Sequence, residues 1–247
     1  MRECSKSIVR RLLSANYATR YFRGKGVDIG GAPDPLELYR SLFPLMEEVK
    51  TWDMADGDAQ FMAGVADGTY DFVHSSHCLE HLNDPQEGLQ NWFRILRPGG
   101  HLTITFPDED LYEQGTFPST FNRTHKATFT IFKPSSWSDR SFNVTALATS
   151  LGPSAQIIKI EQIDLAYRYD LPRFDQTLTP VSESCIELVV RKRRPEEVSF
   201  HGQPARTTQP EHDIRIHLNQ YLDDQRRLRE SNVTKPPFTN DDSIRCA

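Results

Sequence analysis

Glycines and carboxylates gather in the first sixty residues in a pattern that can bind a nucleoside. The segment GKGVDIGGAPDPLELY, which begins at Gly24, places two glycines and two prolines directly after a short apolar run. Such a loop lets a ligand lie against the backbone. An acid about twenty residues further on suits a ribose diol, because a carboxylate accepts two hydroxyl hydrogen bonds. Asp53 has that place, at the end of the next apolar segment, so the spacing indicates a ribose-containing ligand.

The same loop lacks the features of a phosphate site. A dinucleotide loop reads G-x-G-x-x-G and holds a pyrophosphate at a helix N-terminus, whereas this loop reads GGAPDP. Asp34 would place a negative charge where the phosphate would lie. We therefore expect a ligand that has a ribose and no phosphate, and an acid so close to the loop also suits a cationic group. A nicotinamide oxidoreductase is disfavoured for the same reason.

Histidines and a glutamate form a second group, in the segment HCLEH. His77, Glu80 and His81 fall at i, i+3 and i+4, on one face if the segment is helical, and His125 is available as a fourth metal ligand. The alternative is that these side chains cap and brace the turn; we adopt it and predict no metal. His125 is also a candidate general base for a hydroxyl acceptor, with an unperturbed pKa near ~6.5, or else an ordinary surface histidine.

Strand and helix patterns alternate between residues 26 and 107, which is typical of βαβ units and of a parallel sheet covered on both faces. One helix has Asp84 as its N-cap and stops at Pro98. Two late segments that read as strands are separated by a stretch too irregular for a crossover helix, which favours an antiparallel pair. The predicted fold class is a Rossmann-like, doubly wound, mostly parallel α/β sheet with that pair at its end. The strand segments are 26–30, 48–54, 68–77, 101–106, 155–163 and 184–192, and the other helical pattern is 36–46.

Segments outside this alternation are expected to be appendages. One amphipathic helix is predicted over residues 5–22, and residues 108–142 predict an insertion with short elements of its own. We assign the main domain to residues 1–194. Residues 195–247 are expected to form a linker, an amphipathic helix over 211–230 in which Asp223 pairs with Arg226 or Arg227, and a flexible tail. The buried face of the first helix is expected to carry Ile8, Val9, Leu12 and Leu13.

Composition narrows the class of protein. The 247 residues carry 29 Lys and Arg against 34 Asp and Glu, a net charge of −5, so extensive phosphate contact with nucleic acid is disfavoured. The four cysteines contain no C-x-x-C pair, which favours a reducing compartment. No apolar run approaches the ~20 residues that span a bilayer. We therefore expect a cytoplasmic protein with no membrane span.

These residues resemble the class I S-adenosylmethionine-dependent methyltransferases, in particular a methyltransferase type 11-like domain. VDIGGAPDP resembles their first motif, and YDFVHSSHCLEHL followed by RILRPGGHLTITFPDED is the most specific match. The resemblance covers about residues 20–192 and implies S-adenosylmethionine as cofactor. Asp28 either joins the cofactor contacts or organises the loop by accepting backbone N–H bonds. The other contacts that the resemblance implies are the loop Gly30, Gly31 and Ala32 at the methionine part, Asp53 at the ribose, Asp58 and Ala59 at the adenine, and Ser76 and His77 at the floor.

The resemblance implies methyl transfer to a small-molecule or glycan-type acceptor, with O-methylation favoured over N-methylation. The alternative is a catalytically inactive scaffold or binding module of the same fold, because no residue of the acceptor pocket is diagnostic. Two departures from the family pattern are visible. Ala32 replaces the second loop glycine, and the stretch from Asp53 to Asp58 is so short that a strand and helix normally found there are expected to be truncated.

Overall fold

A computed structural model describes residues 3–203 together with Leu222, Asp223, Arg226, Arg227 and Arg229. The chain divides into two units, Met1–Pro204 and Ala205–Ala247. The predicted helix 211–230 lies largely outside the described residues, and the predicted tail 231–247 lies wholly outside them. Within that helix, the expected pairing of Asp223 with Arg226 is present at 3.0 Å. In the described part of the chain, every helix is too short or too polar to cross a bilayer.

A six-stranded sheet forms the centre of the first unit, with the strand order β2-β1-β3-β4-β8-β7. The four strands β2, β1, β3 and β4 run parallel, and β8 runs antiparallel to both β4 and β7. This arrangement confirms the predicted mostly parallel sheet and its antiparallel pair. The strands are β1 (Gly24–Ile29), β2 (Met46–Trp52), β3 (Tyr70–Ser76), β4 (Leu96–Pro107), β7 (Ala155–Ile163) and β8 (Cys185–Lys192).

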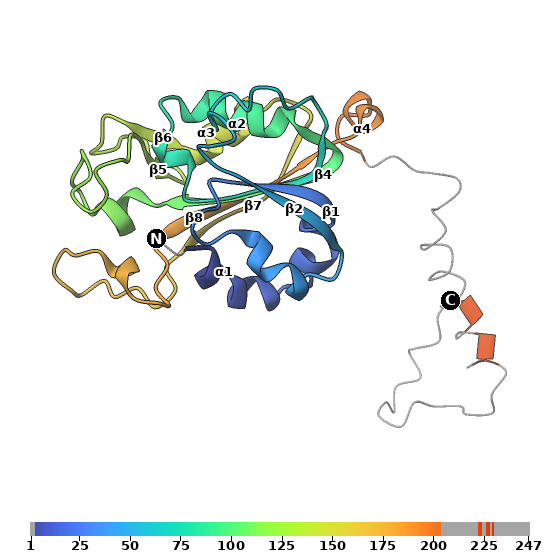
Figure 1. Cartoon of the computed structure of the whole chain (residues 1–247), viewed down its shortest axis with the longest axis horizontal. Helices are drawn as coiled ribbons and strands as arrows, with labels where there is room; N and C mark the ends of the chain where they lie inside the picture. The colour runs from blue at the N-terminus through green and yellow to red at the C-terminus, as the bar shows by residue number, and fades with distance from the viewer. Residues whose placement is uncertain (1–2, 204–221, 224–225, 228, 230–247) are drawn as a thin grey trace. The chain divides into compact units, whose positions relative to one another are not determined.

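Helices cover both faces of this sheet. Figure 1 shows α2 (Pro85–Arg94) and α3 (Val144–Ser150) above it and α1 (Glu3–Leu12) beneath it. One apolar core lies on the side of α2 and α3 and contains Trp92, and a second lies on the side of α1 and contains Phe22. Because each face of the sheet is buried, its central strands read as continuous apolar runs.

Helix α2 begins as its sequence predicts and ends earlier. The carboxylate of Asp84 accepts hydrogen bonds from the backbone N–H groups of Gln86 and Glu87, and Pro85 occupies the first turn. The predicted end at Pro98 is wrong, because the helix ends at Arg94 and β4 already begins at Leu96. The strand pairs with β3 at Leu96 and again from His101 onward, and the Pro-Gly-Gly segment between them forms an irregularity in this pairing.

The N-terminal segment differs most from its prediction. The helix expected over 5–22 is divided into α1 and a short π-helix, η1 (Tyr17–Tyr21). Of the four side chains expected on the buried face, only Ile8 is buried, while Val9 and Leu13 are 70% and 85% exposed. The buried face of α1 instead carries Cys4, Ser7, Ile8 and Arg11. The apolar pattern predicts the wrong face of α1 because Arg11, a charged residue that such a pattern assigns to the surface, is buried.

The region around β2 is shorter and less helical than a complete βαβ unit. The helix predicted over 36–46 is a 3-10 helix, η2 (Leu36–Leu42), in which only Leu36 is buried, and Met46 already belongs to β2. Residues 53–69 form turns with no strand, as expected from the short spacing. Strand β2 is therefore the edge of the described sheet.

The predicted insertion at 108–142 has short elements of its own. They are the π-helix η4 (Glu109–Glu113) and two three-residue strands, β5 (Thr128–Thr130) and β6 (Ser141–Asn143), which pair in parallel. The predicted linker at 195–210 begins with a short helix, α4 (Pro195–Ser199). Its Glu197 is buried and accepts a hydrogen bond from Arg191 at 3.0 Å.

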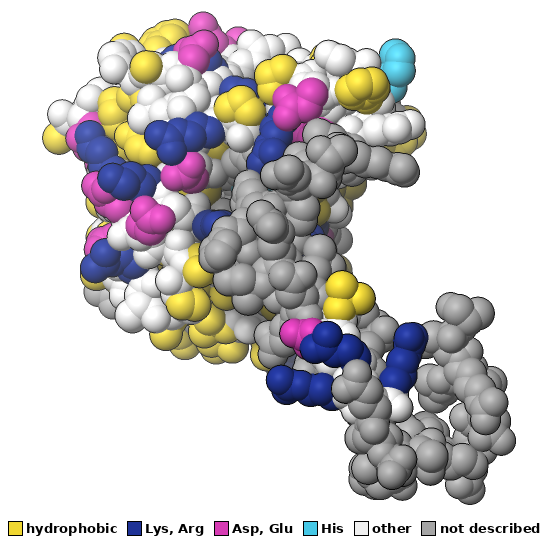
Figure 2. Space-filling model, turned by 90° about the vertical axis from the view of Figure 1, so that its right-hand side faces the viewer, with side chains coloured by type: hydrophobic (Ala, Val, Ile, Leu, Met, Phe, Trp, Pro, Cys, Tyr) yellow, Lys and Arg dark blue, Asp and Glu magenta, His cyan; other side chains and the backbone are white. Residues whose placement is uncertain are grey.

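Figure 2 shows one face of the molecule, on which Lys and Arg side chains lie beside Asp and Glu side chains. Oppositely charged side chains also form ion pairs on the surface of the first unit, such as Arg97 with Asp71 at 2.9 Å and Lys25 with Glu48 at 3.6 Å. A face on which both signs alternate lacks the single-sign field that attracts nucleic acid.

A buried network connects α1 with the sheet and with the first loop. The guanidinium of Arg11 lies 3.1 Å from Glu187 on β8 and 2.9 Å from Nε2 of His74 on β3. A guanidinium only donates hydrogen bonds, so Nε2 of His74 accepts, and its Nδ1–H donates to Asp28 at 2.6 Å. Burial lowers the pKa of His74, which agrees with this neutral tautomer. The second oxygen of Asp28 accepts the backbone N–H of Leu36 at 2.7 Å.

We expect Glu187→Gln to lower the free energy of unfolding by about 3–5 kcal/mol, because it leaves Arg11 buried without a counter-charge. Burial alone would raise the pKa of Glu187, but the surrounding cations outweigh burial and hold this pKa well below its usual range. The stabilisation is therefore complete above about pH 4.3 and is lost as pH falls through the folded-state pKa. Urea unfolding between pH 3 and pH 7 measures both effects.

The matched control is Glu161→Gln, which removes an exposed carboxylate that also pairs with Lys159. We expect the control to cost less than about 1 kcal/mol. Equal losses in the two variants would contradict the assigned role of Glu187.

Candidate functional site

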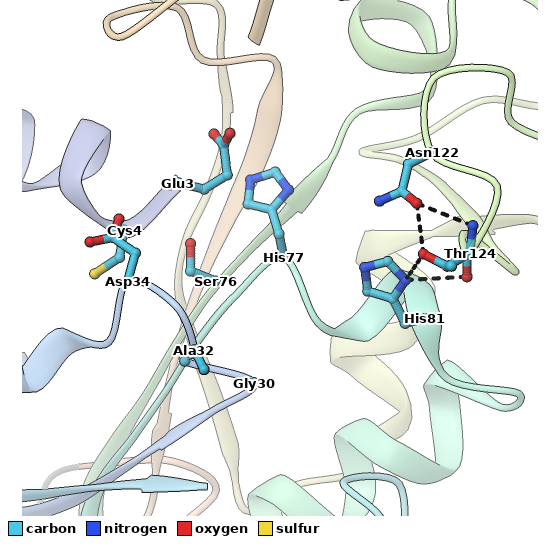
Figure 3. A pocket seen from close by; sticks show the side chains of 11 residues that line it. Glu3, Cys4, Gly30, Ala32, Asp34, Ser76, His77, His81, Asn122 and Thr124 are labelled. Atoms are coloured by element: carbon cyan, nitrogen blue, oxygen red, sulfur yellow. Dashed lines mark hydrogen bonds between the residues drawn. The ribbon is translucent and has the colours of Figure 1, made fainter. Parts of the chain in front are cut away.

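A cavity of about 260 Å³ opens at the carboxyl ends of β1 and β3. Figure 3 shows the loop after β1 below, the start of α1 on one side, and the insertion on the other. This is the edge at which open parallel sheets bind ligands. The cavity is lined by Glu3, Cys4, Gly30, Gly31, Ala32, Asp34, Ser76, His77, His81, Asn122 and Thr124.

The glycine loop packs too tightly for larger residues. Gly30 has φ +72°, and a Cβ on it would lie 2.7 Å from the sulfur of Cys78. A Cβ on Gly31 would lie 2.4 Å from Oδ2 of Asp28. Asp28 itself is fully buried, with both oxygens already hydrogen-bonded. Of the two roles considered for Asp28, its geometry fits the loop-organising one.

Asp34 joins the loop to the first helix. Its carboxylate accepts the backbone N–H of Ser5 at 2.8 Å and the hydroxyl of Tyr39 at 2.5 Å. Burial and the hydrogen bond to Asp34 raise the pKa of Tyr39 to about 12, so this hydroxyl remains a donor. A carboxylate in the first turn of α1 is favoured by the helix dipole. The acid that we expected to exclude phosphate therefore also positions α1 over the cavity.

Asp53 contacts the loop from the end of β2. Its Oδ2 accepts the backbone N–H of Ala32 at 3.2 Å, and its Oδ1 accepts that of Met54 at 2.7 Å. Asp58 is exposed and accepts the backbone N–H of Gln60 at 2.8 Å. Ala59 is fixed by its carbonyl, which accepts the indole N–H of Trp92 at 2.8 Å. None of the three predicted nucleoside contacts, Asp53, Asp58 and Ala59, lines the cavity.

Ser76 and His77 line the cavity where β3 ends. The Ser76 hydroxyl accepts a hydrogen bond from Thr105 at 3.2 Å. His77 has φ +57°, and its Nδ1 lies 3.4 Å from Oε1 of Glu80. Burial alone would lower the pKa of His77, but interactions with Cys185 and Glu80 outweigh it and raise this pKa well above its ordinary value. The imidazolium form therefore places a positive charge at this wall.

The histidine and glutamate group of the sequence does assemble. Single ligand atoms of Glu80, His81 and His125 lie within 4.8 Å of one another. His81 lines the cavity, whereas His125 is buried behind it, with its Nδ1 2.7 Å from the carboxylate of Glu113. Nε2 of His125 faces Glu80 at 3.9 Å. His125, the candidate general base, therefore lies between two carboxylates, those of Glu113 and Glu80, and does not line the cavity.

Sequence reasoning missed four residues that line the cavity and one that orients His125. Glu3 and Cys4 precede the predicted first helix, and Asn122 and Thr124 lie in the insertion, whose sequence has no clear period. Glu113 belongs to the same insertion. The only signal in the sequence was the density of polar and aromatic residues at 108–142. It indicated that this segment is an insertion, but it did not indicate which of its residues line the cavity.

A model of the methyltransferase domain family matches residues 9–143, which is more than half of the chain. A ubiquinone biosynthesis O-methyltransferase of Pectobacterium atrosepticum is 31% identical over 102 residues. That match covers 41% of this chain and 35% of the relative, so it spans about a third of the relative's length.

Two solved structures share the fold. A protein of Bacillus halodurans described as a methyltransferase superposes with a TM-score of 0.51 and 12% identity, covering 75% of this chain and 99% of that chain. A SAM-dependent methyltransferase of Archaeoglobus fulgidus gives 0.50 and 18%, covering 78% and 95%. At these identities the likeness shows the Rossmann-like methyltransferase fold alone.

The site fits S-adenosylmethionine, the cofactor that the sequence motifs imply. The glycine loop allows close approach to the backbone, and Asp53 is half-exposed beside it. The acids around the loop suit a sulfonium cation and disfavour a phosphate. With more than half of its length matched, the chain belongs to the methyltransferase domain family.

Proposed function

We propose that this enzyme transfers the methyl group of S-adenosylmethionine to an oxygen of a small-molecule or glycan-type acceptor. The observation that carries the proposal is the polar wall opposite the glycine loop, where Asn122, Thr124 and His81 of the cavity lie together. Hydrogen-bonding groups of this kind suit a hydroxylated acceptor. The O-methyltransferase named among the relatives supports the same chemistry.

The donor is proposed to lie partly inside and partly outside the cavity. At about 260 Å³ the cavity is somewhat smaller than a typical ligand pocket of ~300 Å³ or more, so we assign it to the methionine and methyl end. Gly30, Gly31 and Ala32 would contact that end, with Ser76 and His77 at the floor. The nucleoside would follow the surface from Asp53, which would bind the ribose hydroxyls, to Asp58 and Ala59 at the adenine.

Methyl transfer mainly requires that the protein position the donor and the acceptor. The acceptor oxygen forms a bond to the methyl carbon as the carbon–sulfur bond breaks, the sulfur keeps the electron pair, and the hydroxyl proton is released. Because the sulfonium is already activated, alignment supplies much of the rate, and a general base is optional. Asp28 would act as a positioning residue, and His125 would act through the group around Glu80 rather than as a free base.

We expect Asp53→Asn to weaken S-adenosylmethionine binding by about tenfold to a hundredfold, because hydrogen bonds to a charged group contribute about 1.5–3 kcal/mol. The asparagine keeps an oxygen that can accept the Ala32 N–H, so the loop is expected to persist. Calorimetric titration of S-adenosylmethionine and S-adenosylhomocysteine measures the change.

Glu48→Gln is the charge-matched control, on the exposed side of the same strand. Its affinity is expected to equal that of the unchanged protein. The absence of binding to folded, ligand-free protein would overturn the proposed donor site, and an unchanged affinity in Asp53→Asn would overturn the role of Asp53.

We expect Gly30→Ala to cost about 1–2 kcal/mol for the left-handed backbone and about 1–3 kcal/mol more for the contact with Cys78. Gly64→Ala isolates the first cost, because Gly64 has φ +81° and nothing lies within 4 Å of its added Cβ. Urea unfolding of both variants measures the difference. Similar losses in the two variants would contradict the predicted clash, because they would mean that the Gly30 loop shifts to relieve the contact with Cys78.

A further inference from the structure

Glu80 is a buried carboxylate without hydrogen-bond partners of ordinary geometry. The residue is fully buried, and neither side-chain oxygen has a hydrogen bond. The nearest cationic nitrogen is Nδ1 of His77, at 3.4 Å from Oε1. The imidazolium of His77 balances the charge of Glu80, but neither oxygen of this carboxylate is hydrogen-bonded, which is unusual for a buried polar group. Both oxygens are therefore available to a further ligand.

Two imidazoles are turned toward this carboxylate. Nε2 of His81 and Nε2 of His125 each lie 3.9 Å from Oε1 of Glu80. That separation is too long for a hydrogen bond. It is short enough for a shared metal ion, since two atoms that each lie about 2.1 Å from one metal are at most about 4.2 Å apart.

The far nitrogens of both rings are held by acceptors. Nδ1 of His125 lies 2.7 Å from Oε1 of Glu113, and Nδ1 of His81 lies 3.2 Å from the backbone carbonyl of Thr124. In each case the Nδ1–H donates, which leaves a lone pair on Nε2 that points at Glu80. A carboxylate or carbonyl behind the distal nitrogen is the usual support of a metal-binding histidine.

We propose that Glu80, His81 and His125 bind one divalent transition-metal ion. Two imidazole lone pairs and a carboxylate oxygen face one another there, as three ligands of one ion would. Two imidazoles and one carboxylate suit Zn²⁺, Mn²⁺, Fe²⁺ or Co²⁺ better than Mg²⁺ or Ca²⁺, which prefer oxygen ligands. The bracing role that the sequence favours is met by other contacts, the ion pair of His77 with Glu80 and the hydrogen bond from His81 to the Thr124 carbonyl. These contacts leave Nε2 of His81 and Nε2 of His125 unused.

The location suggests what the ion does, and this part rests on the proposed function. His81 lines the cavity, so an open coordination position there would face the acceptor. A hydroxyl bound to the cation would lose its proton to solvent more readily, which makes its oxygen a better nucleophile toward the methyl carbon. The metal would thereby replace the general base that His125 alone does not provide.

The test uses the full chain without a histidine tag, stripped with a chelator and desalted. Titration with Co²⁺ is followed by visible absorption and by calorimetry. We expect one Co²⁺ per chain with ligand-field bands of a nitrogen and oxygen site, and at least tenfold weaker binding in His81→Ala and in His125→Ala. The control is His201→Ala, which removes an exposed histidine outside the group and should leave the Co²⁺ affinity unchanged.

Circular dichroism checks that each variant folds, and His81→Ala is decisive because this side chain is partly exposed and its loss is readily tolerated. Folded wild-type protein that binds no Co²⁺, or His81→Ala that binds it as tightly as wild type, would overturn the metal site. Titration of S-adenosylmethionine on the stripped protein separates the two proposals. Donor binding without metal binding would overturn the metal site alone, and metal binding without donor binding would overturn the donor site alone.

Discussion

A buried arginine sets the main constraint on this fold. Arg11 has no exposed surface, and an unpaired guanidinium in the interior would be strongly destabilising. Its charge is balanced by Glu187 on β8, and another donor is taken up by His74 on β3. One cation therefore holds the first helix, the antiparallel end of the sheet and the parallel centre together. These partners lie far apart in the chain, so the network forms only when the sheet has assembled.

The same network fixes the glycine loop on its buried side. His74 donates a hydrogen bond to Asp28, and Asp28 accepts the backbone N–H of Leu36. These two hydrogen bonds fix the backbone that follows the two glycines. On the outer side, Asp34 fixes the first turn of α1 beside the cavity. The first helix precedes every recognisable motif and still forms one wall of the site. The glycine loop and α1 are therefore expected to respond together to changes in the buried charges.

Two buried carboxylates in this protein differ in how they are satisfied. Glu187 contacts two arginines and Lys159 and accepts a hydrogen bond from Tyr17, so the protein itself balances its charge. Glu80 has imidazoles around it at distances that do not allow hydrogen bonds to His81 and His125. The proposed metal site rests on this contrast: the protein supplies hydrogen bonds to Glu187, whereas Glu80 has the imidazolium of His77 beside it and two oxygens without hydrogen bonds.

Local pattern was enough to predict the strands, the N-cap at Asp84, the glycine loop and the position of Asp53, because each depends on neighbours in sequence or on strand order. It was not enough for the buried face of α1, and it named two roles for Asp28 and two for the group around Glu80 without the contacts that distinguish them. Those features depend on Arg11 meeting Glu187, on His74 meeting Asp28, and on His125 reaching Glu80 from the insertion. The sequence by itself determined the fold class and the position of the glycine loop. The tertiary structure alone decided which charges are buried and what balances them, because a charge can be buried only where a distant partner arrives.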